Sequence, residues 1–192
     1  MKRICIVQGH PSSGGGHFCH ALAQAYAEGA GATGHEVKML CVATIDFPLL
    51  RTKEDWDAGR PPISIIEAQE TIRWAEHLVI IFPLWIGAMP ALLKGFFEQA
   101  LRPGFAMALT RNGGWTKLLA GRSARVVVTM GMPAMVCRWY FGAPGLKSLT
   151  QNLALVGIKP RRSLLVGSIE AMGDARREDW LHRLRRLGRK AA

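Results

Sequence analysis

Five short runs of apolar residues, most of them rich in valine and isoleucine, alternate along the chain with stretches whose apolar residues recur at helical spacing. Repeated strand–helix units predict a parallel sheet that is covered by helices on both faces. We expect strands at residues 3–8, 35–43, 77–82, 124–130 and 162–168, and helices at 18–34, 64–75, 90–101, 145–155 and 174–188. Ser64 and Glu67 form a capping-box pattern at the start of the second helix.

The connections between these elements limit the topology. Right-handed crossovers allow few arrangements of five parallel strands. We expect the flavodoxin-like one, a three-layer sandwich of class α/β whose strand order is 2-1-3-4-5. In that order the first and third strands are neighbours, and ligands bind beyond the carboxyl ends of the strands at this point. The loops 9–17, 83–89 and 131–143, which follow the first, third and fourth strands, should therefore meet at one crevice.

The length of 192 residues predicts a single domain over residues 1–192. Turn-forming residues at 102–123 indicate an excursion from it, and 174–192 form a basic C-terminal helix and tail. The apolar run at 4–7 is too short for a signal peptide, and the longest apolar stretch, 78–93, is shorter than a membrane-spanning helix and contains two prolines. We therefore expect a cytoplasmic protein without a transmembrane segment.

The net charge of +11 is concentrated near the C-terminus, because ten basic and four acidic residues follow position 158. A basic segment of this kind attracts nucleic acid, anionic lipid or the phosphates of a cofactor. A solvated helix face is the ordinary alternative, and the sequence indicates no specific nucleic-acid partner.

The four cysteines, Cys5, Cys19, Cys41 and Cys137, are far apart and form no C-x-x-C pair. This spacing argues against a zinc site or a redox dithiol, and no other metal site is expected. Reduced and mostly buried thiols are the ordinary interpretation, with Cys19 of interest because it lies beside a glycine-rich loop.

The first of the three loops, GHPSSGGGHF, offers backbone N–H groups, hydroxyls and the start of a helix. These groups together favour an anion such as a phosphate. The loop is not a Walker A motif, since no GK[ST] follows, and a plain glycine-rich turn is an equally good interpretation.

The second and third loops offer different chemistry. PLWIGAMP places Trp85 and Ile86 beside a glycine, an apolar wall on which an aromatic ring can stack, although Trp85 can instead fill the core. TMGMPAMVCRWYFG carries Arg138, which can face an anionic oxygen or a flavin carbonyl, and Tyr140, which can donate a proton or a hydrogen bond. Both can equally be rim residues.

The segment FPLWIGAMPALLKGFFEQALRPGFAM closely resembles the corresponding segment of the NAD(P)H:quinone oxidoreductase family, which includes DT-diaphorase and the modulator-of-drug-activity type. The opening strand with its H-P pair and Phe18, and TMGMP in place of the family's T-T-G-G loop, extend the resemblance over about residues 3–170. It implies a flavodoxin-like enzyme with FAD or FMN, usually a homodimer. Such an enzyme passes hydride from NAD(P)H through the flavin to a quinone or similar acceptor by a ping-pong route.

The resemblance also implies roles for individual residues. The flavin phosphate would lie near the first loop, the flavin ring along the second, and the pyrimidine side of the ring against the third; Tyr140 falls near the active-site tyrosine, and Phe105 and Met107 near the wall of the quinone pocket. The implied cofactor-binding residues are His10, Ser12, His17, Phe18, Cys19, Pro83, Leu84, Trp85, Ile86, Gly87, Thr129, Met130, Gly131 and Met132, and the catalytic candidates are Tyr140 and Arg138.

The chain departs from the family pattern in several places. The first loop is two residues longer, with His17 and Cys19 where the family has serine and asparagine. Met130 and Met132 replace smaller residues, and the family's active-site histidine after the tyrosine has no counterpart.

The helix at 90–101 carries a wide apolar face, formed by Leu92, Leu93, Phe96, Phe97, Ala100 and Leu101. A second copy of the chain would bury the excess and give a homodimer, whereas the excursion at 102–123 is the alternative cover. For function, the leading hypothesis is the flavoenzyme. The alternatives are a flavin-binding ancillary subunit of a membrane transport system, without significant turnover of its own, and a nucleic-acid-associated protein that uses the basic tail.

Overall fold

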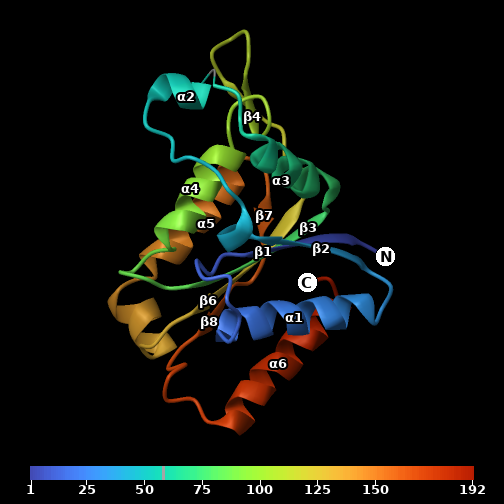
Figure 1. The fold of residues 1–192 in the computed structure, drawn as a ribbon, viewed down its shortest axis with the longest axis vertical. Helices are drawn as coiled ribbons and strands as arrows, with labels where there is room; N and C mark the ends of the chain where they lie inside the picture. Colours follow the sequence, from blue (N-terminus) through green and yellow to red (C-terminus); the bar gives the residue numbers. More distant parts are fainter. Residues whose placement is uncertain (58) are drawn as a thin grey trace.

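The computed structural model describes residues 1–57 and 59–192 and shows a central parallel sheet between two layers of helices (Figure 1). The strand order is β2-β1-β3-β6-β7, with β8 also paired to β6, and this confirms the predicted 2-1-3-4-5 order. The strands are β1 (Arg3–Gln8), β2 (Glu36–Cys41), β3 (His77–Pro83), β6 (Ser123–Thr129), β7 (Lys159–Pro160) and β8 (Leu164–Val166).

The helices cover both faces of this sheet. On one face lie α1 (Phe18–Gly31) and α6 (Asp174–Arg189), and on the other α3 (Ile63–Trp74), α4 (Ala91–Ala100) and α5 (Pro144–Leu155) (Figure 1). Successive strand residues face opposite layers, so that Cys5 and Val7 pack with α3 and α4 while Ile4 and Ile6 pack with α1. The central strand β3 is buried at every position because both faces are covered, whereas β2 at the edge is exposed or only partly buried.

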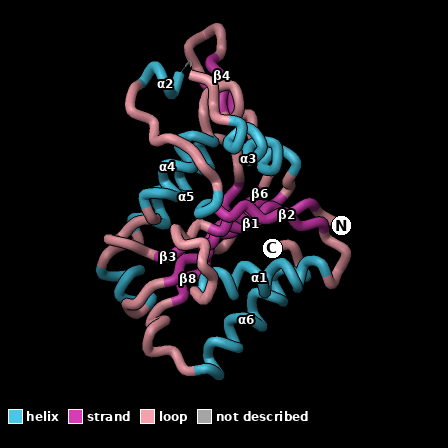
Figure 2. Tube along the Cα trace, in the orientation of Figure 1, coloured by secondary structure: helices cyan, strands magenta, loops and turns pink. Residues whose placement is uncertain are grey.

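Helices α1 and α6 cross at two glycines. A Cβ atom on Gly29 would lie 2.0 Å from the carbonyl oxygen of Arg185, and one on Gly188 would lie 2.2 Å from that of Tyr26. Only glycine permits this approach, which brings the basic helix against α1. The two chain ends lie close together beside these helices (Figure 2), and the Lys2 Nζ donates to the carbonyl of Ala191.

The predicted fifth strand is wrong in its extent. Of the predicted residues 162–168 only 164–166 form a strand, β8, and a further short strand, β7, precedes the predicted range at residues 159–160. Pro160 has no N–H group with which to extend the hydrogen bonding of the sheet. In addition, the Arg125 guanidinium donates a hydrogen bond of 2.6 Å to the carbonyl of Arg162. This bond occupies an oxygen that would pair with the neighbouring strand if the strand were continuous.

The predicted capping box is also wrong. Helix α3 begins at Ile63 with Pro62 in the N-cap position, and no side chain caps it. The Ser64 hydroxyl instead donates to the carbonyl of Asp46 at 2.5 Å and ties the helix to the connection after β2.

The excursion at 102–123 contains a small antiparallel hairpin, β4 (Met107–Leu109) with β5 (Trp115–Lys117), at the end of the molecule far from α6 (Figure 1). Three further short elements lie within the described ranges: η1 (Val42–Thr44), α2 (Lys53–Asp57) and a π-helical turn, η2 (Val136–Tyr140). None of the helices in the described ranges is long and apolar enough to cross a membrane.

Candidate functional site

Three loops leave adjacent strands at the carboxyl edge of the sheet, as predicted. The amide of Gly9 donates to the carbonyl of Ile81 at 2.8 Å, and the amide of Leu84 donates to that of Thr129 at 2.7 Å. These bonds fix the first residues of the loops after β1 and β3. A Cβ atom on Gly9 would lie 2.6 Å from Leu93 Cδ2, so any larger residue in the first loop would displace the Leu93 side chain of α4.

The second loop is a tight two-residue turn. Trp85 and Ala88 exchange both backbone hydrogen bonds at 2.9 Å, and the two residues between them have positive φ, 47° at Ile86 and 74° at Gly87. Positive φ at both positions defines a type I′ turn, which glycine accepts and a β-branched residue resists. Strain of this kind clusters at ligand sites.

Trp85 lies at the base of this turn and is 49 % exposed, so it does not fill the core. Its ring meets the ring of His10 edge-on, with 6.3 Å between the centroids. The alternative that Trp85 is a core residue is therefore excluded, and its indole belongs to the surface shared by the first and second loops.

An apolar cavity of about 310 Å³ lies between the second and third loops. A volume of this size is within the range of small-molecule sites. Its lining includes three residues that the sequence did not single out for a site, Cys137, Phe141 and Pro144. The lining residues are Leu84, Ile86, Gly87, Met132, Cys137, Phe141 and Pro144.

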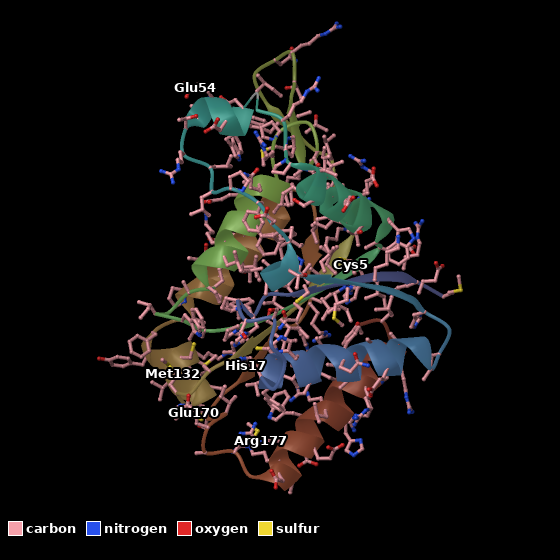
Figure 3. All side chains as sticks on the ribbon, viewed as in Figure 1. Cys5, His17, Glu54, Met132, Glu170 and Arg177 are labelled. Atoms are coloured by element: carbon pink, nitrogen blue, oxygen red, sulfur yellow. The ribbon has the colours of Figure 1, made fainter. Side chains whose placement is uncertain are left out.

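The start of the third loop is held by the strand at the edge of the sheet. The amide of Met130 donates to the carbonyl of Val166 at 2.9 Å, and the amide of Ser168 donates to that of Met132 at 3.0 Å. A Cβ atom on Gly167 would lie 2.3 Å from the Ala134 nitrogen, so this contact also requires glycine. The carboxylate of Glu170, close to Met132 in Figure 3, lies beside Gly131.

Three histidines gather where the first loop enters α1. The rings of His10 and His17 are stacked with 3.8 Å between centroids, and His20 lies 5.4 Å from His10 and 5.7 Å from His17. Burial, followed by the charge of His17, lowers the pKa of His10. Sequence reasoning missed His20, although its spacing of three residues from His17 places both on one side of the helix.

The histidine cluster lies beside backbone N–H groups at the start of α1 that no side chain caps. The Nδ1 of His10 accepts a hydrogen bond from the amide of Ser12 at 3.1 Å, so a neutral His10 carries its proton on Nε2. His17 is the N-cap of α1 with extended backbone and no side-chain cap, which leaves the first N–H groups of the helix for another acceptor. Within the described ranges, no three histidine, cysteine or acidic side chains are placed to hold a metal ion.

Cys19 and Thr129 lie behind the loops. Both are buried, and the Cys19 Sγ is 3.1 Å from the Thr129 Oγ1. Burial raises the pKa of the Cys19 thiol to about 11, so it stays protonated at neutral pH. Their side chains support the first and third loops from the core. Phe18 is half-buried, with the Arg177 guanidinium 5.3 Å from its ring.

The predicted catalytic and quinone-pocket residues do not line the cavity. Tyr140 is 82 % exposed, and Arg138 faces a different groove. Phe105 is buried beneath the Arg73 guanidinium, and Met107 lines a separate cavity between α4 and α5. The π-helical turn accounts for the first difference, because it directs Cys137 and the residue after η2, Phe141, toward the cavity.

The Flavodoxin_2 family profile, described as a flavodoxin-like fold, matches residues 2–189. The chain belongs to the Flavodoxin_2 family. This match confirms the resemblance to the NAD(P)H:quinone oxidoreductase family that was inferred from the sequence, and the flavodoxin-like strand order of the structure agrees with it. The NAD(P)H:quinone oxidoreductase from Methanothermobacter marburgensis superposes with a TM-score of 0.80 at 25% identity, covering 100% of this chain and 99% of that one.

Two curated relatives of this Flavodoxin_2 member match parts of the sequence. The FMN-dependent NADH:quinone oxidoreductase of Ruegeria pomeroyi is 25% identical over 100 residues, 45% of this chain and 49% of that protein. The glutathione-regulated potassium-efflux system ancillary protein KefG of Shigella dysenteriae is 36% identical over 90 residues, 46% of each chain. The chain thus spans less than half the length of these relatives.

Proposed function

We propose that the protein is a flavin-dependent oxidoreductase that transfers hydride from NAD(P)H to a quinone or similar acceptor. The observation that carries the proposal is the position of the apolar cavity. It lies between the I′ turn and the third loop, and Trp85 connects the turn to the histidine cluster at the start of α1. A flavin has the same division into a planar apolar ring and an anionic phosphate.

The residues present fit this group. The ring would lie along Trp85, Ile86 and Gly87, where a Cβ atom on Gly87 would meet nothing within 4 Å and the space beside the turn is open. Met132 and Phe141 would close the other side. The phosphate would lie at the first turn of α1, where the helix dipole and the N–H groups at the start of the helix favour an anion.

When bound, a flavin supplies the two-electron chemistry between nicotinamide and acceptor. The protein would orient the flavin and shield it from water. Leu84, Met132 and Phe141 exclude water from the cavity, which strengthens each hydrogen bond made inside it. The amide of Met130 is already paired with Val166, so the next N–H groups of the third loop would have to stabilise negative charge on the ring edge, against the opposing carboxylate of Glu170 beside Gly131.

FMN is the form of flavin that we propose, because the Ruegeria pomeroyi relative is FMN-dependent by name. The apolar cavity and the histidine cluster accommodate a ring and one phosphate. FAD would need an additional surface for its adenine. Mass analysis of the cofactor released from the purified protein distinguishes the two.

A homodimer remains part of the proposal, although one argument for it fails. Leu93, Phe96, Phe97 and Ala100 are buried within the chain itself, where Phe47 packs 6.2 Å from Phe96. The sheet and the connection after β2 together thus cover most of the α4 face. The remaining support is the cavity of about 160 Å³ between α4 and α5, beside the exposed Leu155. The molecular mass in solution tests this assembly.

The experiment that tests the enzyme is a visible spectrum of the purified protein, followed by NAD(P)H oxidation with a water-soluble benzoquinone. We expect flavin absorbance and quinone-dependent turnover. A colourless protein that refuses added FMN would refute the proposal.

A second candidate is a flavin-binding ancillary subunit of a transport system. The observation that favours this candidate is the 36% identity to the potassium-efflux ancillary protein, which extends over 46% of the chain. In that case the protein would bind flavin and show negligible turnover with every quinone tested.

A further inference from the structure

An exposed apolar surface lies on both sides of the cavity. We name it the aromatic ridge and define it as Ile86, Met135, Trp139, Tyr140 and Phe141. Ile86 and Phe141 line the cavity itself, and Tyr140 packs edge-on against Phe141 with 4.9 Å between ring centroids. The exposed fractions are 104% for Ile86, 73% for Met135, 78% for Trp139, 82% for Tyr140 and 55% for Phe141. Scattered apolar residues are common on surfaces, but a cluster of this kind marks an interaction site.

The ridge is carried by a segment at the periphery of the fold. The third loop with η2 projects at the side of the molecule between the sheet and α5, with Met132 near its base (Figure 1, Figure 3). The segment is anchored at β8, because the amide of Met130 donates to Val166 and Gly167 packs against the backbone of Ala134.

Arginines border the ridge on the side of α6. Arg138 and Trp139 line one groove with Trp180 and Arg183, and the next groove continues from Trp180 and Arg183 along the helix. The Arg183 guanidinium lies over the Trp180 ring, 4.8 Å from its centroid. The border comprises Arg138, Arg176, Arg183 and Arg186, with Asp179 as the acidic residue among the groove-lining side chains.

We propose that the aromatic ridge inserts into the headgroup region of an anionic lipid bilayer, with the bordering arginines on lipid phosphates. Tryptophan and tyrosine favour this depth because their rings are apolar and their N–H and O–H groups stay hydrated. Met135 and Ile86 supply purely apolar contacts. The cavity would then face the lipid. If the protein is the proposed flavoenzyme, on which this step rests, its electron acceptor would be a quinone dissolved in the lipid.

The composition of the surface favours lipid over single-stranded nucleic acid. Nucleic-acid grooves place aromatic rings along a basic track so that bases stack while phosphates are neutralised. Here the aromatic rings stand together with aliphatic side chains, and the charges lie to one side. The ring of Trp180, the aromatic residue inside the basic border, is already covered by Arg183.

The test is flotation of the full-length protein with vesicles of phosphatidylcholine, with and without phosphatidylglycerol. We expect binding to the anionic vesicles that weakens as salt rises. Trp139→Glu and Met135→Glu should each weaken it about tenfold or more, and Arg183→Gln about fivefold. Trp115→Glu is the matched control, because Trp115 is 52% exposed on the distant hairpin; it should bind like the wild type.

Four outcomes would overturn the proposal. The first is no flotation with anionic vesicles, and the second is an equal loss of vesicle binding in Trp115→Glu and Trp139→Glu. The third is a change in the molecular mass of the protein in solution on Trp139→Glu, and the fourth is binding of a single-stranded oligonucleotide that Trp139→Glu abolishes while the wild type does not bind vesicles. The third outcome would assign the ridge to a second copy of the chain, and the fourth to nucleic acid.

A second measurement, reduction of two different quinones, separates this inference from the proposed function. Trp139→Glu should slow reduction of a long-chain quinone dissolved in vesicles and leave reduction of a soluble benzoquinone unchanged. Equal rates of variant and wild type on the vesicle quinone would overturn the choice of acceptor. Vesicle binding without turnover of either quinone would overturn the proposed enzyme while the membrane surface stands.

Discussion

The amide of Gly145 donates to the carbonyl of Gly87 at 3.1 Å, so the first turn of α5 rests directly on the I′ turn. A Cβ atom on Gly145 would lie 2.7 Å from both the Gly87 oxygen and the Ala88 Cα. The turn is therefore positioned by a helix that follows the third loop, and the two walls of the cavity are mechanically joined.

This contact predicts that Gly145→Ala displaces the turn. We expect a loss of about 1–3 kcal/mol in the free energy of unfolding, together with weaker flavin retention, measured by urea unfolding and flavin titration. Gly31→Ala, at the last residue of α1, is the control, because a Cβ atom there meets nothing within 4 Å. Equal losses in the two variants would show that the α5 contact does not hold the turn.

Trp85 should contribute to flavin retention without supporting the fold. Because its side chain is half-exposed, we expect Trp85→Ala to lower flavin affinity by about tenfold, from lost stacking, with an unchanged unfolding midpoint of the flavin-free protein. Trp115→Ala, on the hairpin, removes an indole of similar exposure. If both variants retain flavin like the wild type, the ring does not lie on Trp85.

Sequence patterns determined most of the fold because burial on both faces of a parallel sheet leaves a clear trace. The run from Leu78 to Phe82 is apolar at every position, and it forms the central strand. The same logic could not detect the break between β7 and β8, since it depends on a hydrogen bond from the distant Arg125.

The site was less predictable for a local reason. The three loops could be placed from the ends of the strands, but the π-helical turn has no periodicity that a short segment reveals. Sequence comparison therefore selected Tyr140, whereas the structure turns Cys137 and Phe141 inward. The left-handed conformation of Ile86 was equally hidden, because a β-branched residue normally avoids it.

The strain at Ile86 leads to a stability prediction. Ile86→Gly removes a β-branched residue from positive φ, and no buried surface is lost because the side chain is fully exposed. We expect the free energy of unfolding of the flavin-free protein to rise by about 1 kcal/mol. Ile66→Gly, in α3, should lower it by roughly the same amount through helix propensity. A drop in both variants would contradict the strained turn.

Cys19 should be chemically inert. With its pKa raised to about 11 by burial, roughly one thiol in a thousand is ionised at pH 8. Native protein treated with iodoacetamide should be labelled at the half-buried Cys41 well before Cys19, as read by peptide mass spectrometry. Early labelling of Cys19 would mean that the first loop opens to solvent.

His77 links stability to pH. Its ring is buried in β3, and Nδ1 lies 2.8 Å from the Ser123 hydroxyl. Burial first, then the charges of Lys2, Arg125 and Arg161, lower its pKa to about 4. In the unfolded chain the pKa of this histidine is about 6.5. The unfolded chain therefore binds the proton more readily than the folded protein does.

The sign follows from this difference. The contribution of neutral His77 is fully present above about pH 6.5 and is lost as pH falls toward 4, by about 3 kcal/mol in total. Urea unfolding of flavin-free protein between pH 7 and 4 measures it. His77→Gln should flatten this decline, whereas His182→Gln, exposed on α6, should leave it in place. An equally steep decline in His77→Gln would assign the acid sensitivity to other groups.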